Sequence, residues 1–306
     1  MLRLSVPTWS VSLIPCSLPQ EQRSPAFPGQ VLKRRPHGER YNGCTHSTVE
    51  ANLKSKVEPS LFDLVASGRV FVVAEIGKNF IQTQEERPTE EYLENAKALV
   101  KASHEAGADA VKFQTHNVED EQLNIHVVAP HFKGADRYSW LTRNTNATPL
   151  DAFWRPFKAY CDELGIIFHS TPMSRGAARK LNELGVELWK VGSGDILDFV
   201  TLDYLARTGK PIIMSSGMST LEELDQAIDF LKRRNAKVVL LHCVSRYPCP
   251  AEDLNLATIG FLKQRYGILV GFSDHSIGID SALAAVALGA EVIESPANWN
   301  FSRSYM

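Results

Sequence analysis

The chain has 306 residues, of which 44% are hydrophobic and 22% charged, and its formal net charge is -2. This near-neutral balance gives no reason to expect a nucleic acid or an anionic membrane as partner. No apolar run reaches the roughly 18 residues that a membrane-spanning helix needs. The five cysteines show no CxxC pairing, which favours a reducing, cytoplasmic location.

Residues 1–56 differ in composition from the rest of the chain. They are rich in Ser, Pro and Arg, poor in acidic residues, and have no helical or alternating period. This composition predicts a disordered extension. An organellar targeting segment has the same bias, so targeting and a gene-model artefact stay open as alternatives. Residues 57–306 are predicted to form the folded domain, with 57–69 as a short amphipathic lead-in to its first strand.

From Val70 onward the chain repeats a unit of helix, glycine and apolar strand. The predicted helices cover 92–106, 152–164, 174–184, 200–208 and 280–288, and each is followed by a glycine, at positions 107, 165, 185, 209 and 289. Glycine just beyond a helix end is the expected left-handed cap. Strands that alternate with helices in this way imply right-handed crossovers and a parallel sheet.

Strand candidates follow from the same repeat. They lie near residues 70–77, 110–115, 166–171, 188–193, 211–217, 237–243, 269–275 and 291–294. Eight such strands predict an α/β fold of the (β/α)8 TIM-barrel type. A Rossmann sheet is disfavoured, because no GxGxxG turn follows the first strand.

Several of these apolar strands end on polar residues that burial alone would not select. They are Glu75, Lys112, Gln114, His169, Thr171, Lys190, Ser193, Ser215, His242, Ser273, His275 and Glu294. The carboxyl ends of barrel strands meet at one mouth, so the pattern predicts a site there. Residues two apart share a face, and Lys112 and Gln114 are therefore expected inside, with Val111 and Phe113 facing the helices.

The residue types point to an anionic ligand. Two inward lysines, Lys112 and Lys190, together with strand-end hydroxyls, suit a phosphate or carboxylate dianion. Glu75 and Glu294 end the first and eighth strands, which are neighbours in a closed barrel, and such carboxylates orient water or move a proton. Salt bridges from these carboxylates to the two lysines are the alternative interpretation. His275 is a candidate metal ligand or acid–base group, although its spacing alone supports neither role.

Considered together, the motifs resemble those of one family. AEIG, VKFQT, STPMSR, WKVGSGD, SSGMS, LHCVSRYP and GFSDHS occur in this order. Over residues 70–294 they resemble the N-acetylneuraminate (sialic acid) synthase family, which includes the legionaminic and pseudaminic acid synthases. The resemblance implies a condensation of phosphoenolpyruvate with an N-acetylated amino-sugar aldehyde, such as N-acetylmannosamine. The products are a nine-carbon sialic-type 2-keto acid and inorganic phosphate.

The resemblance also implies a role for each site residue. The phosphoenolpyruvate pocket is expected to comprise Lys112, Thr171, Lys190, Ser193, Ser215 and Ser273. Gln114 is expected near the reacting centre, with Glu75 and Glu294 directing water to C2 of phosphoenolpyruvate. Ser245 and Tyr247 are expected to contact substrate, and Asp195 to orient sugar hydroxyls. His275 resembles the first of two histidines that bind a divalent metal, manganese or magnesium, which polarises the aldehyde.

The chain departs from the family pattern near its C-terminus. Where the family reads Glu-Lys/Arg-His-Phe, this chain has Glu294, Ser295 and Pro296, so a proline stands at the second ligand position and weakened metal binding is expected. In the AEIG loop, Phe80 follows Asn79 where relatives have a histidine.

We also expect the barrel to be truncated after strand eight. The last helix is then missing, as is the antifreeze-like domain that reaches into the partner's site in the homodimeric family. A catalytically impaired or inactive protein, and another phosphoenolpyruvate aldol-type keto sugar acid synthase, are the alternatives. The sequence leaves the acceptor sugar open, with selectivity expected in loop 116–150.

Overall fold

The computed structural model describes residues 60–83, 85–125, 128 and 136–297. The predicted extension 1–56 and the expectations about the tail from residue 298 lie outside the described residues. The described residues all belong to one compact unit, Lys56–Met306.

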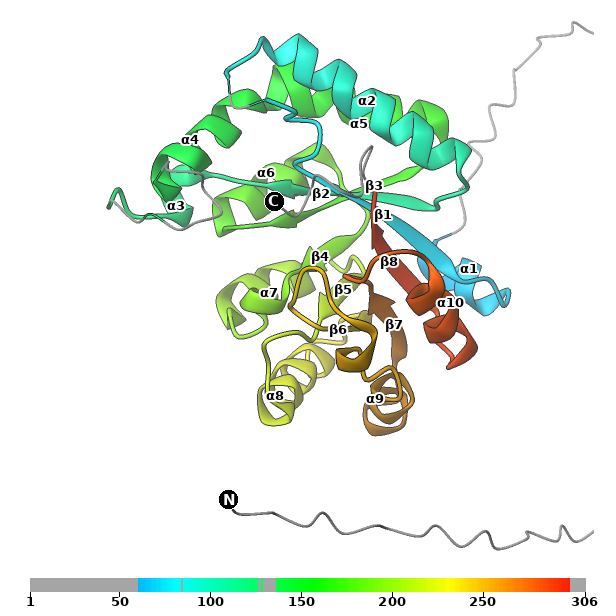
Figure 1. The fold of residues 1–306 in the computed structure, drawn as a ribbon. Coiled ribbons are helices and arrows are strands. Elements are labelled where there is room, and N and C mark those ends of the chain that lie inside the picture. Colours follow the sequence, from blue (N-terminus) through cyan, green and yellow to red (C-terminus); the bar gives the residue numbers. More distant parts are fainter. Residues whose placement is uncertain (1–59, 84, 126–127, 129–135, 298–306) are drawn as a thin grey trace, which may run out of the picture. The chain divides into compact units, whose positions relative to one another are not determined.

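In the described part of the chain, eight parallel strands form one closed barrel in sequence order (Figure 1). They are Phe71–Gly77 (β1), Ala110–Thr115 (β2), Ile167–Pro172 (β3), Trp189–Val191 (β4), Ile212–Ser215 (β5), Val238–Cys243 (β6), Leu269–Ser273 (β7) and Val292–Pro296 (β8). Closure comes from β1, which pairs in parallel with both β2 and β8. The predicted TIM barrel and its strands are confirmed.

Helices surround the barrel and connect its strands (Figure 1). They are α1 (Leu61–Ala66), α2 (Thr89–Glu105), α3 (Val118–Glu121), α4 (Arg137–Ala147), α5 (Arg155–Leu164), α6 (Arg175–Leu184), α7 (Phe199–Arg207), α8 (Leu221–Lys232), α9 (Thr258–Tyr266) and α10 (Asp280–Ala287). The predicted helices are confirmed, and the five glycines predicted to cap them have φ between +71° and +93°. None of the helices in the described ranges has the length and apolar character needed to cross a bilayer.

Helices α3, α4, α8 and α9 were not predicted from the sequence. A signal for α8 was present, because Thr220 and Glu223 form a capping box at its start. Helix α4 likewise begins at an N-cap, where the Asp136 side chain accepts from the Ser139 amide. By contrast, α9 has no side-chain cap, so nothing local marks its start.

Apolar side chains fill two separate layers. One layer lies between the outer face of the strands and the helices, and the other fills the barrel interior. The interior cluster comprises Leu61, Phe71, Val73, Ala110, Leu188, Ile213, Val239, Leu241 and Val292. Leu61 belongs to α1, so the segment predicted as a lead-in closes the amino-terminal end of the barrel with its buried face.

One interior position accepts only glycine. A Cβ at Gly271 would lie 2.2 Å from the Val292 carbonyl oxygen and 2.7 Å from Leu241 Cδ2. The first of these atoms belongs to a backbone that cannot move aside. Glycine in a strand interior often marks such a close approach, and here it lets β7 and β8 pack closely just below the polar end of the barrel.

Candidate active site

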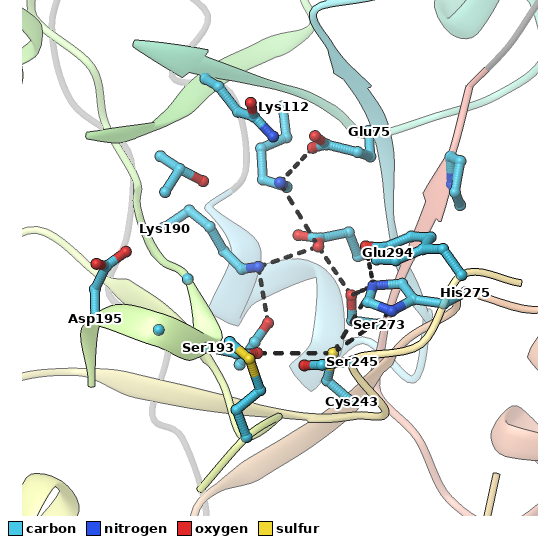
Figure 2. A pocket seen from close by; sticks show the side chains of 18 of the residues that line it. Glu75, Lys112, Lys190, Ser193, Asp195, Cys243, Ser245, Ser273, His275 and Glu294 are labelled. Atoms are coloured by element: carbon cyan, nitrogen blue, oxygen red, sulfur yellow. Dashed lines mark hydrogen bonds and ion pairs between the residues drawn. The ribbon is translucent and has the colours of Figure 1, made fainter. Parts of the chain in front are cut away.

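A cavity of about 830 Å³ opens at the carboxyl ends of the strands. The residues to which the resemblance assigns a role all line it, namely Glu75, Lys112, Gln114, Thr171, Lys190, Ser193, Asp195, Ser215, Ser245, Tyr247, Ser273, His275 and Glu294. Side chains from different strands converge on this space (Figure 2). The structure therefore brings the predicted site together, while the role of each residue stays a prediction.

The cavity floor is a network of buried charges. Lys112 forms an ion pair with Glu75, and its Nζ lies 3.7 Å from Glu294 Oε1. Lys190 Nζ donates to Glu294 Oε1 at 3.0 Å. Both lysines and Glu294 are at most 5% exposed. In Figure 2 these side chains point toward one another, with Glu294 between the two lysines. The salt bridges considered as an alternative to catalytic carboxylates are present, and they do not exclude catalysis.

Hydroxyl groups extend the network toward the mouth. Lys190 Nζ donates to Ser215 Oγ at 2.8 Å, and Ser273 Oγ donates to Glu294 Oε1 at 3.0 Å. Ser193 and Ser245 border Gly217, where a Cβ would lie 2.8 Å from Ser193 Oγ and 2.3 Å from Ser245 Oγ. Glycine at 217 therefore gives these two hydroxyls the room to line the cavity.

The two floor carboxylates have opposite pKa shifts. Burial disfavours the carboxylate form and raises the pKa of Glu75, although Lys112 opposes this shift. Glu294 is also buried, but the positive charges of Lys112 and Lys190 outweigh its desolvation and lower its pKa to about 2. The two carboxyl groups of the floor thus differ in acidity, a division that is typical of acid–base sites.

The lysines also differ from each other. For Lys112, the charges of Glu294 and Glu75 outweigh the desolvation caused by burial, and its pKa is raised. Desolvation lowers the pKa of Lys190 despite its contact with Glu294. Lys112 is therefore the more firmly charged of the two cations.

His275 presents one ring nitrogen to the cavity. Its Nδ1 donates to the Val244 carbonyl oxygen at 2.7 Å, so Nε2 is the acceptor in this tautomer. Nε2 contacts the Tyr247 hydroxyl and lies 3.4 Å from Ser273 Oγ. Burial lowers the pKa of His275 to about 4. The ring is therefore neutral near pH 7, as a metal ligand must be.

A proline stands where the second ligand was expected. Pro296 is in register with Glu75 and lines the cavity, but it offers no donor atom for a metal. Across the residues that the structure describes, no group of three or more His, Cys, Asp or Glu side chains is placed to hold a metal ion. These residues do not fit the predicted manganese or magnesium centre, and His275 as a ligand stays a prediction.

The rim contains residues that the sequence analysis missed. Arg137, at the start of α4, lines the cavity with a side chain that is 40% exposed, and its Nε donates to Gln122 Oε1 at 3.1 Å. Asp195 lies at the rim too, where burial raises its pKa with help from Asp198 and Glu121. Arg137 follows a loop rather than a strand, so no strand-end pattern could have identified it.

Cys243 and Asp274 were also missed, although signals existed for both. Cys243 is two residues beyond Leu241 on β6, and period-two alternation places both inside the barrel. Its Sγ lies 3.8 Å from Ser193 Oγ. Asp274 stands between two predicted site residues, and its Oδ1 accepts from Ser276 N at 2.8 Å.

Two strand histidines named in the sequence analysis have different locations. His242 does not converge on the cavity, and that expectation was wrong. Its Nε2 is 2.7 Å from the Leu254 carbonyl oxygen and its ring stacks on Phe272, in the layer between strands and helices. Alternation from Leu241 explains this outward direction. His169 is in register with Lys112, lies inside the barrel below the cavity and is fully buried.

Comparison with known proteins places the chain among sugar acid synthases. A sequence model of the NeuB family matches residues 99–296. Human N-acetylneuraminate-9-phosphate synthase is 34% identical over 229 residues, which are 73% of this chain and 60% of that protein. N,N'-diacetyllegionaminic acid synthase of Campylobacter jejuni is 35% identical over 207 residues, or 66% of this chain and 62% of the relative.

A solved structure agrees with these matches. The N-acetylneuraminic acid (sialic acid) synthetase of Leptospira borgpetersenii, crystallised with citrate, gives a TM-score of 0.63 at 31% identity. The match covers 76% of this chain and 74% of that one. The chain spans less than two thirds of the two curated relatives' lengths, 60% and 62%.

Proposed function

This chain belongs to the NeuB family, and from that membership we propose that it condenses phosphoenolpyruvate with an N-acetylated amino-sugar aldehyde. The products are a nine-carbon sialic-type 2-keto sugar acid and inorganic phosphate. The observation that carries the proposal is the cavity floor, where two buried lysines share two carboxylates of opposite pKa shift. The names of the relatives, which make N-acetylneuraminate 9-phosphate and diacetyllegionaminic acid, support this class of product.

Phosphoenolpyruvate binds at the floor in this proposal. Its carboxylate and phosphate groups are anions, and the ammonium groups of Lys112 and Lys190 supply the opposite charge in a site that excludes most water. In the ligand-free structure Ser215 contacts Lys190 and Ser273 contacts Glu294. When phosphoenolpyruvate binds, both hydroxyls turn to donate to it. Thr171 and Ser193 line the same space and complete the set of hydroxyl donors.

Carbon–carbon bond formation requires a proton for the acceptor. C3 of phosphoenolpyruvate attacks the aldehyde carbon, and the aldehyde oxygen becomes a hydroxyl by taking up one proton. Glu75 supplies it, because burial favours its protonated form. Glu294 stays ionised between the lysines and keeps their ammonium groups charged and oriented.

Phosphate then leaves by cleavage of the bond between C2 and oxygen. A water molecule adds at C2 and gives one proton to the Glu75 carboxylate, which restores the acid. The bond between C2 and the phosphate ester oxygen then breaks. The proton of the new C2 hydroxyl goes to the departing phosphate, and the C2 oxygen becomes the keto group. Gln114, which shares the inward face of β2 with Lys112, is within the same cavity and orients the reacting groups.

The acceptor occupies the space above the floor. Asp195, Ser245 and Tyr247 line this outer part together with Arg137. A carboxyl group, two hydroxyls and a guanidinium suit a polyhydroxylated, N-acetylated chain. N-acetylmannosamine, its 6-phosphate and a bacillosamine-derived sugar are the acceptors to compare.

A second candidate is a catalytically impaired member of the family. The observation that favours it is Pro296, which lines the cavity where the resemblance expects a metal-binding histidine. This candidate binds phosphoenolpyruvate at the intact floor but turns over slowly or not at all.

An assay of phosphate release tests the proposal. The full chain receives phosphoenolpyruvate, each acceptor in turn, and manganese, and mass spectrometry identifies the sugar acid. Equal amounts of phosphate and sugar acid support the synthase. A chain that is inactive with all acceptors, while Pro296→His is active with manganese, identifies the impaired member. Inactivity of both proteins refutes the proposed reaction.

A further inference from the structure

His169 is a buried polar side chain that the proposed chemistry does not use. It is 0% exposed, and neither ring nitrogen has a hydrogen-bond partner among the residues that the structure describes. A buried polar group left without a partner loses its hydration with no compensating hydrogen bond, which destabilises the fold. Groups of this kind in a native interior usually have a structural or catalytic explanation, or a bound water.

The nearby carboxylate has an unused oxygen. Glu294 Oε1 accepts from Lys190 and from Ser273, both at 3.0 Å, and is paired with Lys112 at 3.7 Å. Glu294 Oε2 is also buried, and within the described part of the chain it has no hydrogen-bond partner. The contacts of this carboxylate with the two lysines and with Ser273 therefore all fall on one oxygen.

His169 is in register with Lys112, and Lys112 Nζ lies 3.7 Å from Glu294 Oε1, so the ring and the carboxylate flank the same floor lysine. Burial and Lys112 lower the pKa of His169, and Glu294 opposes them by raising it. The pKa of Glu294 is in turn lowered by His169, though less than by Lys112 and Lys190. The charged groups that act on the ring are Lys112 on β2, Lys190 on β4 and Glu294 on β8. Burial and Lys112 together lower the pKa of His169 to about 3, so the ring is neutral and carries one N–H.

A neutral imidazole and a carboxylate oxygen are complementary. The ring has one donor and one acceptor, and a carboxylate accepts only. No direct hydrogen bond joins His169 to Glu294, and a buried water with two or more polar partners is the usual bridge across such a gap. Ile167, two residues before His169 on the same face of β3, packs against the apolar interior cluster, so the side of the ring away from the cavity is apolar.

We propose that His169 is a positioning residue that holds Glu294 Oε2 through one buried water, so that Oε1 stays directed at Lys190 and Ser273. Without this contact Glu294 would be held at one oxygen only, and the counter-charge of the lysines would be less firmly fixed. The effect of His169 on catalysis rests on the proposed synthase function. The water-bridged contact itself does not.

A crystal structure of the full chain tests the contact directly. The expected result is an ordered water within about 3.2 Å of a His169 ring nitrogen and of Glu294 Oε2. A site with no water density, or a ring nitrogen bonded elsewhere, overturns the proposal. The crystal structure gives an answer even if the protein has no synthase activity. A failure of the proposed contact can therefore be told apart from a failure of the proposed function.

Kinetics test the positioning role. His169→Phe should lower kcat/KM for phosphoenolpyruvate about tenfold, which is the rate change expected for the net free energy of one hydrogen bond. The KM for the acceptor should be unchanged. His169→Asn keeps a donor and an acceptor and should recover activity to within about threefold of the native value.

His242→Phe is the matched control, because it removes another buried strand histidine that faces the helices rather than the cavity. It should lower the free energy of unfolding but leave kcat/KM unchanged. Equal kinetic effects of His169→Phe and His242→Phe, or no recovery in His169→Asn, overturn the proposal. If His169→Phe does not fold, the activity of His169→Asn and the crystal structure still test the proposed contact.

Discussion

The barrel interior has an apolar half and a charged half, and the same strands build both. The apolar half lies toward the amino ends of the strands and contains Val73, Ala110, Leu188, Ile213 and Val292. Two residues further along the same strands stand Glu75, Lys112, Lys190, Ser215 and Glu294. Residues two apart along a strand share a face. A shift of two residues toward the carboxyl end therefore changes the barrel interior from a packed apolar core to a charged cavity floor. Stability and chemistry are thus assigned to different layers of one barrel.

Loss of a floor cation should give the largest effect. Lys190→Met is expected to lower kcat/KM for phosphoenolpyruvate about 10³-fold, because truncating one partner of a buried charge pair costs about 2–5 kcal/mol. Steady-state phosphate release measures it. Lys101→Met, which removes a lysine side chain that is 62% exposed on α2, is the control and should leave kcat/KM unchanged. Activity within threefold of the native value in Lys190→Met would show that the floor lysines do not bind the substrate.

Leu188, two residues before Lys190, allows the opposite test, in which stability should change and activity should not. Leu188→Ala is expected to reduce the free energy of unfolding by about 2–5 kcal/mol through the cavity that it leaves. Leu188 is 3% exposed and belongs to the interior cluster. Urea unfolding measures the loss, and kcat/KM of the remaining folded protein should stay within threefold of the native value. A large fall in kcat/KM would show that the two layers are coupled rather than separate.

A single methyl group at the edge of the charged half should have an intermediate effect. Gly217→Ala places a Cβ against Ser245 Oγ and Ser193 Oγ, so these hydroxyls must move. We expect kcat/KM to fall about tenfold with little change in the unfolding midpoint. Gly260→Ala is the matched control, because its Cβ in α9 meets no atom within 4 Å. That variant should be as active as the native chain and slightly more stable.

The smallest expected effect is a pH dependence of stability in the charged half. The folded-state pKa of Glu294 is lowered from 4.5 to about 2, so its contribution to stability is present above pH 4.5 and is lost as the pH falls toward 2. The pKa of Glu75 is raised, so its ionisation lowers stability as the pH rises above 4.5.

Urea unfolding midpoints measured from about pH 2 to above pH 4.5 test the opposite effects of Glu294 and Glu75 on stability. Glu294→Gln should weaken the acid sensitivity below pH 4.5, and Glu75→Gln should remove a loss of stability above it. If both variants follow the native pH profile, the two carboxylates do not have opposite shifts.

Strand alternation and capping glycines predicted most of the fold. Lys112 and Gln114 were placed inside the barrel because each lies two residues from the other along an apolar strand, and both line the cavity. The same rule, applied to Leu241, would have directed His242 outward. Arg137 could not be found in this way, since a helix rather than a strand presents it.

The electrostatic division of the floor was also beyond the sequence. Glu75 and Glu294 are the same residue type at matching strand ends, but Glu294 contacts both Lys112 and Lys190, whereas Glu75 is paired with Lys112 and has its pKa raised by the charge of Glu294. Likewise, the missing second ligand at Pro296 was visible in the sequence, whereas the engagement of His275 by Tyr247 depends on how a loop folds back over β7.

The buried position of Leu61 determines where an independently folding barrel has to begin. All eight strands lie after Val70, yet the residue that closes their amino-terminal end lies before it, in a helix capped by Ser60. A protein cut at residue 70 would keep every strand and leave Phe71 and Val73 open to water. It should bind hydrophobic dyes and lose cooperative melting, so the autonomous unit of this chain starts upstream of its first strand.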